Sequence, residues 1–127
     1  MPKRILVIDD EEAIRKAFLL ALEDTDYEVD TVDSGAKGIE FKKNKRYDLI
    51  FLDLKMPGMN GVETLLKLRK MDQEVAVYIV TAFYGEFFEE LERADEDGAY
   101  FEVLRKPISA DQIVLVSKSI LEGPIGY

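Results

Sequence analysis

The chain has 127 residues, of which 47% are hydrophobic and 34% are charged, a composition typical of one folded domain and not of a disordered chain. It contains neither cysteine nor histidine, which excludes disulfides, zinc sites built from these residues and histidine acid–base catalysis. A net charge of −9 disfavours direct binding of nucleic acid, and the lack of a long apolar run argues against a membrane span or a signal peptide, so we expect a cytoplasmic protein.

Short apolar runs alternate with longer amphipathic segments along the whole chain. The pattern predicts, in chain order, a buried strand over residues 4–8, a helix over 11–24, a weaker strand over 27–32, a helix from a Ser34 cap to about residue 44, a buried strand over 48–52, a helix after Asn60, a buried strand over 76–80, a helix over 85–97, a strand over 100–104 and a helix after Ser109 that ends near residue 122. Asn60 with Glu63 and Ser109 with Gln112 have the spacing of capping boxes.

These five strand–helix units predict an α/β fold with a doubly wound parallel sheet that carries helices on both faces. In such a sheet, ligands bind beyond the carboxyl ends of the strands. The residues found there are Asp9 and Asp10 after the first strand, Asp53 after the third, Thr81 after the fourth and Lys106 after the fifth. We therefore expect these residues to meet at one edge of the sheet.

The chemistry of this set is specific. Three crowded carboxylates repel one another and take up protons unless a cation enters. Oxygen ligands without histidine or cysteine favour a hard ion, and Mg²⁺ is the candidate because it binds one or two carboxylates together with phosphate oxygens. A lysine and a threonine hydroxyl suit a phosphoryl group in transit, and a carboxylate can accept that group as an aspartyl phosphate.

Each residue alone also has a plainer interpretation. Asp10 could cap the first helix, Asp53 could start a turn, Thr81 could be an ordinary strand end and Lys106 could be a solvated lysine. The combination of these residues favours a functional site, because four predicted strands each place a suitable group at the same edge of the sheet.

Four segments, ILVIDDEE, DLIFLDLKMPGMNG, VYIVTA and LRKPI, resemble the acidic-pair strand, the phosphoacceptor strand, the threonine-bearing strand and the lysine–proline strand end of the response-regulator receiver domain of two-component systems. The resemblance runs from about Lys3 to Leu121, so it implies one receiver domain over residues 1–127. It also implies a flavodoxin-like fold with the strand order 2-1-3-4-5.

For the metal, the resemblance implies that the side chains of Asp10 and Asp53 and the carbonyl of Lys55 bind Mg²⁺, while Asp9 holds a metal-bound water. For the phosphoryl group, it implies Asp53 as the acceptor and contacts from Thr81 and Lys106.

The donor implied is a phosphohistidine on a sensor histidine kinase or a histidine phosphotransfer protein. The chain would then be no enzyme but a phosphoacceptor regulator that assists its own phosphorylation and dephosphorylation. Signal output to a downstream protein is expected through the face formed by the fourth helix, the fifth strand and the fifth helix.

The chain departs from the family pattern at Val103, where many receivers carry an aromatic residue three positions before the lysine; here Tyr100 and Phe101 come earlier. We therefore expect Phe83 or Tyr84, after the fourth strand, to move in the switch.

Two further expectations concern the loops around the site. The Lys106–Pro107 bond is predicted to be cis, so that the lysine reaches the site while the chain turns toward Ser109. Lys55 and Phe83, two residues beyond Asp53 and Thr81, are large: either they hinder the water that hydrolyses the aspartyl phosphate, or both point to solvent.

Three rival functions fit less well. A haloacid-dehalogenase-type phosphatase needs a second aspartate where the chain has Lys55. A flavin-binding module needs a phosphate loop where the chain has Asp-Asp-Glu-Glu. A pseudo-receiver that only binds partners would not need the complete set of site residues. A stand-alone regulator and a fragment of a longer one fit the sequence equally.

Overall fold

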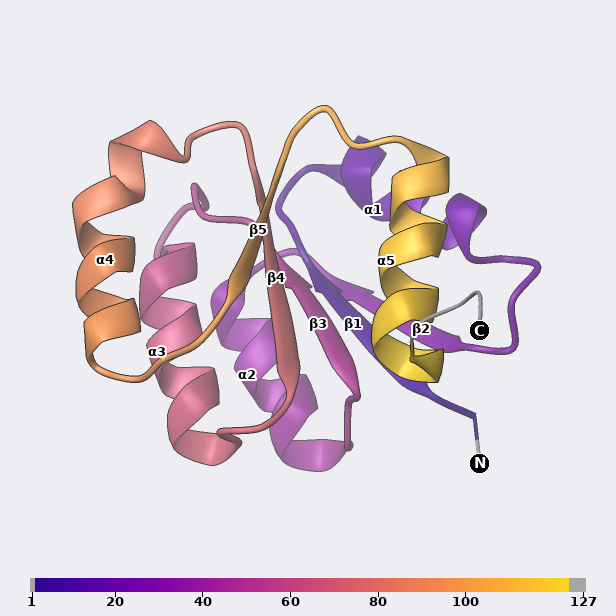
Figure 1. The fold of residues 1–127 in the computed structure, drawn as a ribbon, viewed down its shortest axis with the longest axis horizontal. Helices are drawn as coiled ribbons and strands as arrows, with labels where there is room; N and C mark the ends of the chain where they lie inside the picture. Colours follow the sequence, from indigo (N-terminus) through magenta and orange to yellow (C-terminus); the bar gives the residue numbers. More distant parts are fainter. Residues whose placement is uncertain (1, 124–127) are drawn as a thin grey trace.

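Five parallel strands alternate with five α-helices in the computed structural model, which describes residues 2–123 (Figure 1). The elements are β1 (Arg4–Ile8), α1 (Glu12–Ala21), β2 (Glu28–Val32), α2 (Gly35–Asn44), β3 (Leu49–Leu52), α3 (Gly61–Met71), β4 (Ala76–Thr81), the short 3₁₀ helix η1 (Gly85–Phe87), α4 (Phe88–Glu96), β5 (Glu102–Arg105) and α5 (Ala110–Glu122).

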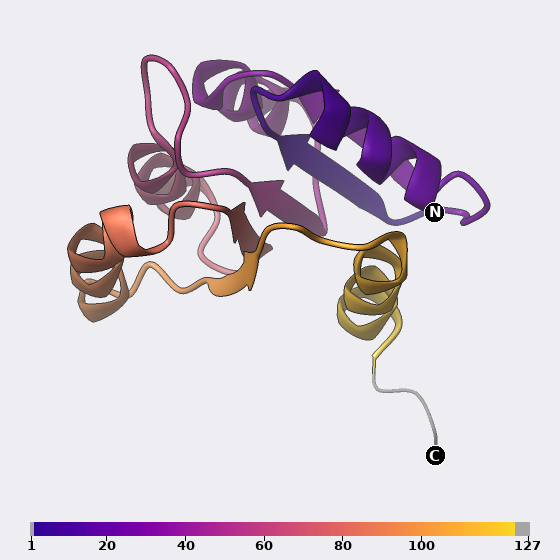
Figure 2. The ribbon, with the colours of Figure 1, turned by 90° about the horizontal axis from the view of Figure 1, so that it is seen from above.

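The strands form one sheet in the order β2-β1-β3-β4-β5, as the family resemblance implied. Helices α1 and α5 cover one face of the sheet and α2, α3 and α4 cover the other (Figure 2). Because both faces are covered, the central strands β1, β3 and β4 are mostly apolar, and all four residues of β3 are apolar and buried.

Alternation along the strands divides the core into two layers. Ile5 and Val7 of β1 pack with Phe18 of α1 and Ile113 of α5, whereas Leu6 and Ile8 face the layer of α2, α3 and α4. A fully buried side chain of this size contributes about 1.5–3 kcal/mol. The two layers therefore fix which side chains each face of the sheet buries, and the parallel direction of the strands places their carboxyl ends at one edge.

The predicted helix starts at Asn60 and Ser109 are confirmed. Asn60 Oδ1 accepts from the Glu63 N–H at 2.9 Å, and the Glu63 side chain accepts in return from the Asn60 N–H at 3.1 Å. Ser109 and Gln112 form the second capping box, with the two bonds at 3.1 and 2.9 Å. Ser34 also caps α2, through the Lys37 N–H.

Several boundaries differ from the expectation. The predicted helix over 85–97 divides into η1 and α4. The strand expected over 100–104 begins only at Glu102, because the carbonyl of Tyr100 accepts from the Arg69 guanidinium, at 3.0 and 2.6 Å, instead of joining the sheet. The first helix ends at Ala21, short of the predicted residue 24, and β4 extends to include Thr81.

Helix α3 begins in close contact with the end of β3. The Gly61 N–H donates to the Leu54 carbonyl at 2.7 Å. A Cβ atom at Gly61 would lie 2.2 Å from the Asp53 carbonyl oxygen, so this position requires glycine for a close backbone approach. The approach holds the loop after Asp53 against α3.

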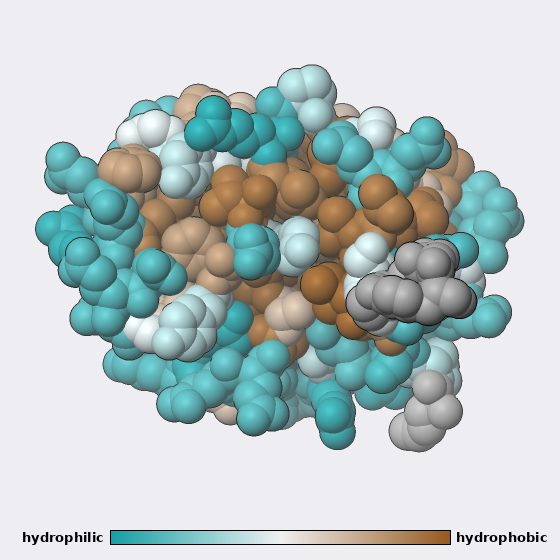
Figure 3. Space-filling model, in the orientation of Figure 1, coloured by the Kyte–Doolittle hydropathy of each residue, from teal (hydrophilic) through white to brown (hydrophobic). Residues whose placement is uncertain are grey.

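Apolar side chains remain visible between α4 and α5, along the β5 edge of the sheet (Figure 3). No helix within residues 2–123 is both long enough and apolar enough to cross a membrane. The Lys106–Pro107 bond is cis, as predicted.

Candidate functional site

The residues predicted for the site lie at the carboxyl edge of the sheet, where backbone hydrogen bonds continue beyond the strands. The Asp53 N–H donates to the Ile8 carbonyl, and the Lys106 N–H donates to the Thr81 carbonyl, both at 2.9 Å. Because β3 lies beside β1, Asp53 comes next to Asp9 and Asp10. Thr81 ends β4, between β3 and β5.

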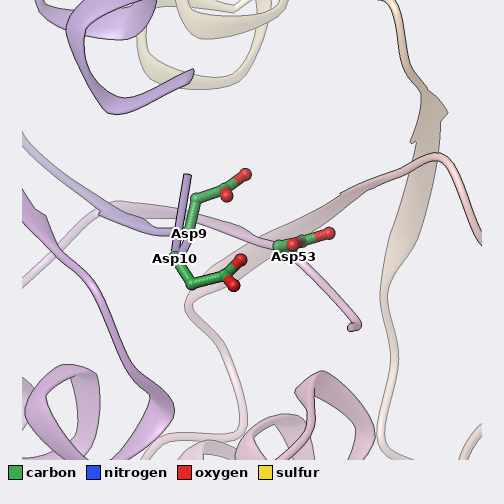
Figure 4. Close-up of side chains that lie close together, drawn as sticks. All are labelled: Asp9, Asp10 and Asp53. Atoms are coloured by element: carbon green, nitrogen blue, oxygen red, sulfur yellow. The ribbon is translucent and has the colours of Figure 1, made fainter. Parts of the chain in front are cut away.

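Three carboxylates gather at this edge. One oxygen each from Asp9, Asp10 and Asp53 lies within 4.8 Å of the others (Figure 4). Asp9 and Asp53 are buried, whereas Asp10 is exposed to solvent. The interpretation of Asp10 as a helix cap is wrong, because Glu11 is the N-cap and the Asp9 side chain accepts from the Glu11 N–H at 2.9 Å.

Lys106 is the cation of the cluster. Its ammonium nitrogen lies 3.1 Å from Asp9 Oδ2, 3.0 Å from Glu11 Oε1 and 3.7 Å from Asp53 Oδ1. Burial alone would lower the pKa of Lys106, but the hydrogen bond to Glu11 and the charges of Asp9 and Asp53 raise it overall. The lysine thus stays charged and lies closer to Asp9 than to Asp53.

The negative charge of Asp53 is less well compensated by Lys106 than that of Asp9. Its Oδ1 atom is buried and has no hydrogen-bond partner among the described residues. Burial and the neighbouring charge of Asp9 raise the pKa of Asp53 to about 7, against the attraction of Lys106. Burial also raises the pKa of Asp9. The site therefore holds excess negative charge that a bound cation would relieve.

This geometry fits a hard divalent cation. The ligand atoms are carboxylate oxygens from three residues on one edge, and the orphaned Asp53 oxygen is an unused acceptor. The donor set contains no nitrogen or sulfur atom, as Mg²⁺ prefers. Mg²⁺ is thus compatible with the residues that are present.

Thr81 is fully buried, and its hydroxyl oxygen accepts from the Phe83 N–H at 2.9 Å. A hydroxyl that accepts one hydrogen bond can still donate its own proton. Thr81 therefore offers a donor beside the cluster and is tied directly to the loop that leads into α4.

The side chains of Lys55 and Phe83 lie together at the rim of the site. The Lys55 ammonium lies 4.4 Å from the centroid of the Phe83 ring and 3.4 Å from Glu86 Oε1. They join the loop after β3 to the loop after β4, and Phe83 keeps 40% of its surface exposed. Lys55 and Phe83 thus contact each other while both stay exposed to solvent, so shielding of the aspartyl phosphate from water stays a prediction.

Two contacts were not anticipated from the sequence. Glu11 binds Lys106, and the Arg15 guanidinium donates to the Asp9 carbonyl at 2.9 Å. The position of Glu11 directly after the acidic pair could have indicated the first contact. The second depends on the path of α1 across the sheet.

Comparison with known proteins gives a consistent result. The family described as the response regulator receiver domain matches residues 5–118. The chain is 32% identical to sporulation initiation phosphotransferase F of Bacillus subtilis, with 89% of each protein covered. It is 37% identical to the alginate biosynthesis transcriptional regulatory protein AlgB of Pseudomonas syringae, over 94% of this chain but only 26% of that protein.

Solved structures agree on the fold. The CheY-like receiver domain protein of Methanospirillum hungatei superimposes with a TM-score of 0.83 at 27% identity, over 97% of both chains. The chemotaxis protein CheY4 of Vibrio cholerae gives a TM-score of 0.82 at 24% identity, over 95% of this chain and all of that one. With the family match over nearly the whole chain, these findings show that the chain belongs to the receiver domains of two-component response regulators, whose general function is that of a phosphoacceptor switch.

Proposed function

We propose that Asp53 is the phosphoacceptor of this receiver and that its donor is a phosphohistidine on a sensor histidine kinase or a histidine phosphotransfer protein. The observation that carries the proposal is the buried Asp53 carboxylate, whose Oδ1 lacks a hydrogen-bond partner among the described residues and lies 3.7 Å from Lys106. An oxygen in that position is shielded from bulk water and available to attack phosphorus.

In the transfer, a carboxylate oxygen of Asp53 forms a bond to phosphorus while the bond from phosphorus to the donor imidazole breaks. The developing charge on the phosphoryl oxygens is met by the Lys106 ammonium and the Thr81 hydroxyl. Thr81 ends β4, which lies beside β3, and Lys106 follows β5, the next strand of the sheet, so both groups are held by the sheet and need little reorganisation. The chain thereby assists its own phosphorylation and later hydrolysis, without turnover of a separate substrate.

The metal proposed for the site is Mg²⁺. The side chains of Asp10 and Asp53 and the backbone carbonyl of Lys55 would bind it, and Asp9 would hold one of its waters. When bound, the ion neutralises charge on the carboxylates and on the transferred group.

The output surface proposed is the face formed by α4, β5 and α5. Thr81 binds the Phe83 N–H, and the next residue, Tyr84, packs edge-on against Phe88 of α4 with ring centroids 5.7 Å apart. The Arg105 guanidinium of β5 lies 4.7 Å from the centroid of the Tyr84 ring. A shift of Thr81 toward a phosphoryl group would therefore disturb this face through Tyr84, although β5 itself has Val103 at the expected aromatic position.

Phosphorylation by acetyl phosphate with Mg²⁺ tests the acceptor. The parent chain should gain the mass of one phosphoryl group, and Asp53→Asn should gain none. Asp26→Asn, which changes an exposed carboxylate away from the site, serves as the matched control and should label like the parent. Equal labelling of Asp53→Asn would show that another residue accepts the group.

We also propose that the chain is a single receiver domain with a core over about residues 3–121.

A further inference from the structure

A groove of about 510 Å³ lies between α4 and α5, at the end of the sheet opposite the aspartates. Its walls include Tyr78 of β4, Phe101, Ile120 of α5 and the exposed Tyr100. Apolar surface continues from it along the β5 edge (Figure 3). The groove thus offers apolar and aromatic contact area on a surface that no described element covers.

The rim of this groove is acidic. Glu74, Asp95 and Glu102 line it, all three are exposed, and none forms an ion pair among the described residues. The single lining cation is Arg69, whose guanidinium is held by backbone carbonyls, including those of Val75 and Tyr100. The Glu102 charge also helps to raise the pKa of the Tyr78 hydroxyl, after burial.

The acidic rim is continuous with a strongly acidic segment of the chain that contains α4. Residues 85–98, which contain α4, carry seven acidic residues and one arginine, so they contribute −6 of the net charge of −9. Within this segment only Glu86 has an ion-pair partner among the described residues, namely Lys55. Acidic residues elsewhere are more often paired: Glu12 with Lys16, Asp33 with Lys37 and Asp72 with Lys42.

We propose that this groove docks a basic amphipathic segment of another protein, with an apolar stripe flanked by lysine and arginine. The apolar walls would bury the stripe, and the carboxylates of Asp95, Glu102 and α4 would meet the cations at the rim. A second copy of this chain is a poor occupant, because it would bring another −9 charge and its own acidic α4 against the same surface.

The role of this docking as signal output rests on the proposed function, but the docking itself requires no phosphoryl transfer. The groove and its charges are present in the unphosphorylated chain described above. The two proposals can therefore fail separately: binding is measured without phosphodonor, and labelling of Asp53 is measured without the binding partner.

A labelled helical peptide of leucine and lysine, of about 18 residues so that a helix can form, is the probe. Fluorescence anisotropy should show that it binds the parent chain and that added salt weakens the complex. A peptide with the same pattern of leucine and glutamate should not bind, and neither should one of serine and lysine, which lacks the apolar stripe.

Charge reversal locates the site. The double variant Asp95→Lys/Glu102→Lys should weaken binding by about tenfold or more. Glu23→Lys/Asp24→Lys makes the same change in net charge at exposed positions after α1 and should weaken it far less. Likewise, Ile120→Ser should weaken binding, whereas Leu20→Ser, at an exposed leucine on α1, should not.

Three results would overturn the proposal. Equal loss in both double variants would mean that the peptide responds only to net charge. Unchanged affinity in Asp95→Lys/Glu102→Lys, with melts that show a folded protein, would place the peptide elsewhere. A dimer in sedimentation that this double variant abolishes would identify a second copy as the occupant. Normal acetyl phosphate labelling of the double variant keeps the outcome separate from that of Asp53.

Discussion

Replacing Asp53 by asparagine should stabilise the metal-free protein. The Asp53 carboxylate is buried, its Oδ1 has no hydrogen-bond partner among the described residues, and burial together with Asp9 raises its pKa to about 7. Ionising a group in such a site costs free energy that the unfolded chain does not incur. Asparagine removes the charge and keeps nearly the same shape.

The size of the effect follows from the pKa. Between the ordinary value of 3.8 and the folded value of about 7, the folded protein binds more protons at Asp53 than the unfolded chain. The free energy of unfolding therefore falls as pH rises through this window, by at most about 4 kcal/mol at 1.36 kcal/mol per pH unit. Since the asparagine amide is itself a polar group that is buried at this position, we expect a net gain of about 1–3 kcal/mol above pH 7.

Urea unfolding at a series of pH values, with chelator present, measures this difference. The advantage of Asp53→Asn should be small near pH 4 and complete above pH 7. Asp26→Asn, at an exposed carboxylate, should differ little from the parent at any pH. An Asp53→Asn variant that is no more stable than the parent above pH 7 would refute the assignment of uncompensated charge to this site.

Other changes at the site should have distinct effects. Millimolar Mg²⁺ should raise the melting temperature of the parent but much less that of Asp10→Ala, and equal shifts would argue against metal binding by this carboxylate. Phe83→Ala and Lys55→Ala should each speed the decay of the aspartyl phosphate, because we propose that the two contacting side chains shield it from water. A barrier lowered by 1.4 kcal/mol would give a decay about tenfold faster, and unchanged decay in both variants would show that they do not shield it. Gly61→Ala should lower stability by about 1–3 kcal/mol, because its Cβ would lie 2.2 Å from the Asp53 carbonyl oxygen, and an unchanged urea midpoint would contradict that contact.

The sequence predicted the helices and strands correctly where interactions between residues close in the chain form them. The capping boxes at Asn60 and Ser109 involve residues three apart, and the buried strand over residues 4–8 is a run of apolar residues, so both were predicted correctly. The start of β5 was wrong because the carbonyl of Tyr100 is taken by Arg69, 31 residues earlier. A bond of that span leaves no signal in the local pattern.

The amino-acid pattern alone was enough to predict the alternation of buried strands and amphipathic helices, and hence which polar residues follow the strands. Parallel strands bring their carboxyl ends to one edge, so the meeting of Asp9, Asp10, Asp53 and Lys106 could be expected from sequence. Which of these charges are compensated could be learned only from the folded arrangement of the side chains. Lys106 lies nearer to Asp9 and Glu11 than to Asp53, and Lys55 lies against Phe83, because side-chain positions depend on burial and on neighbours from other strands.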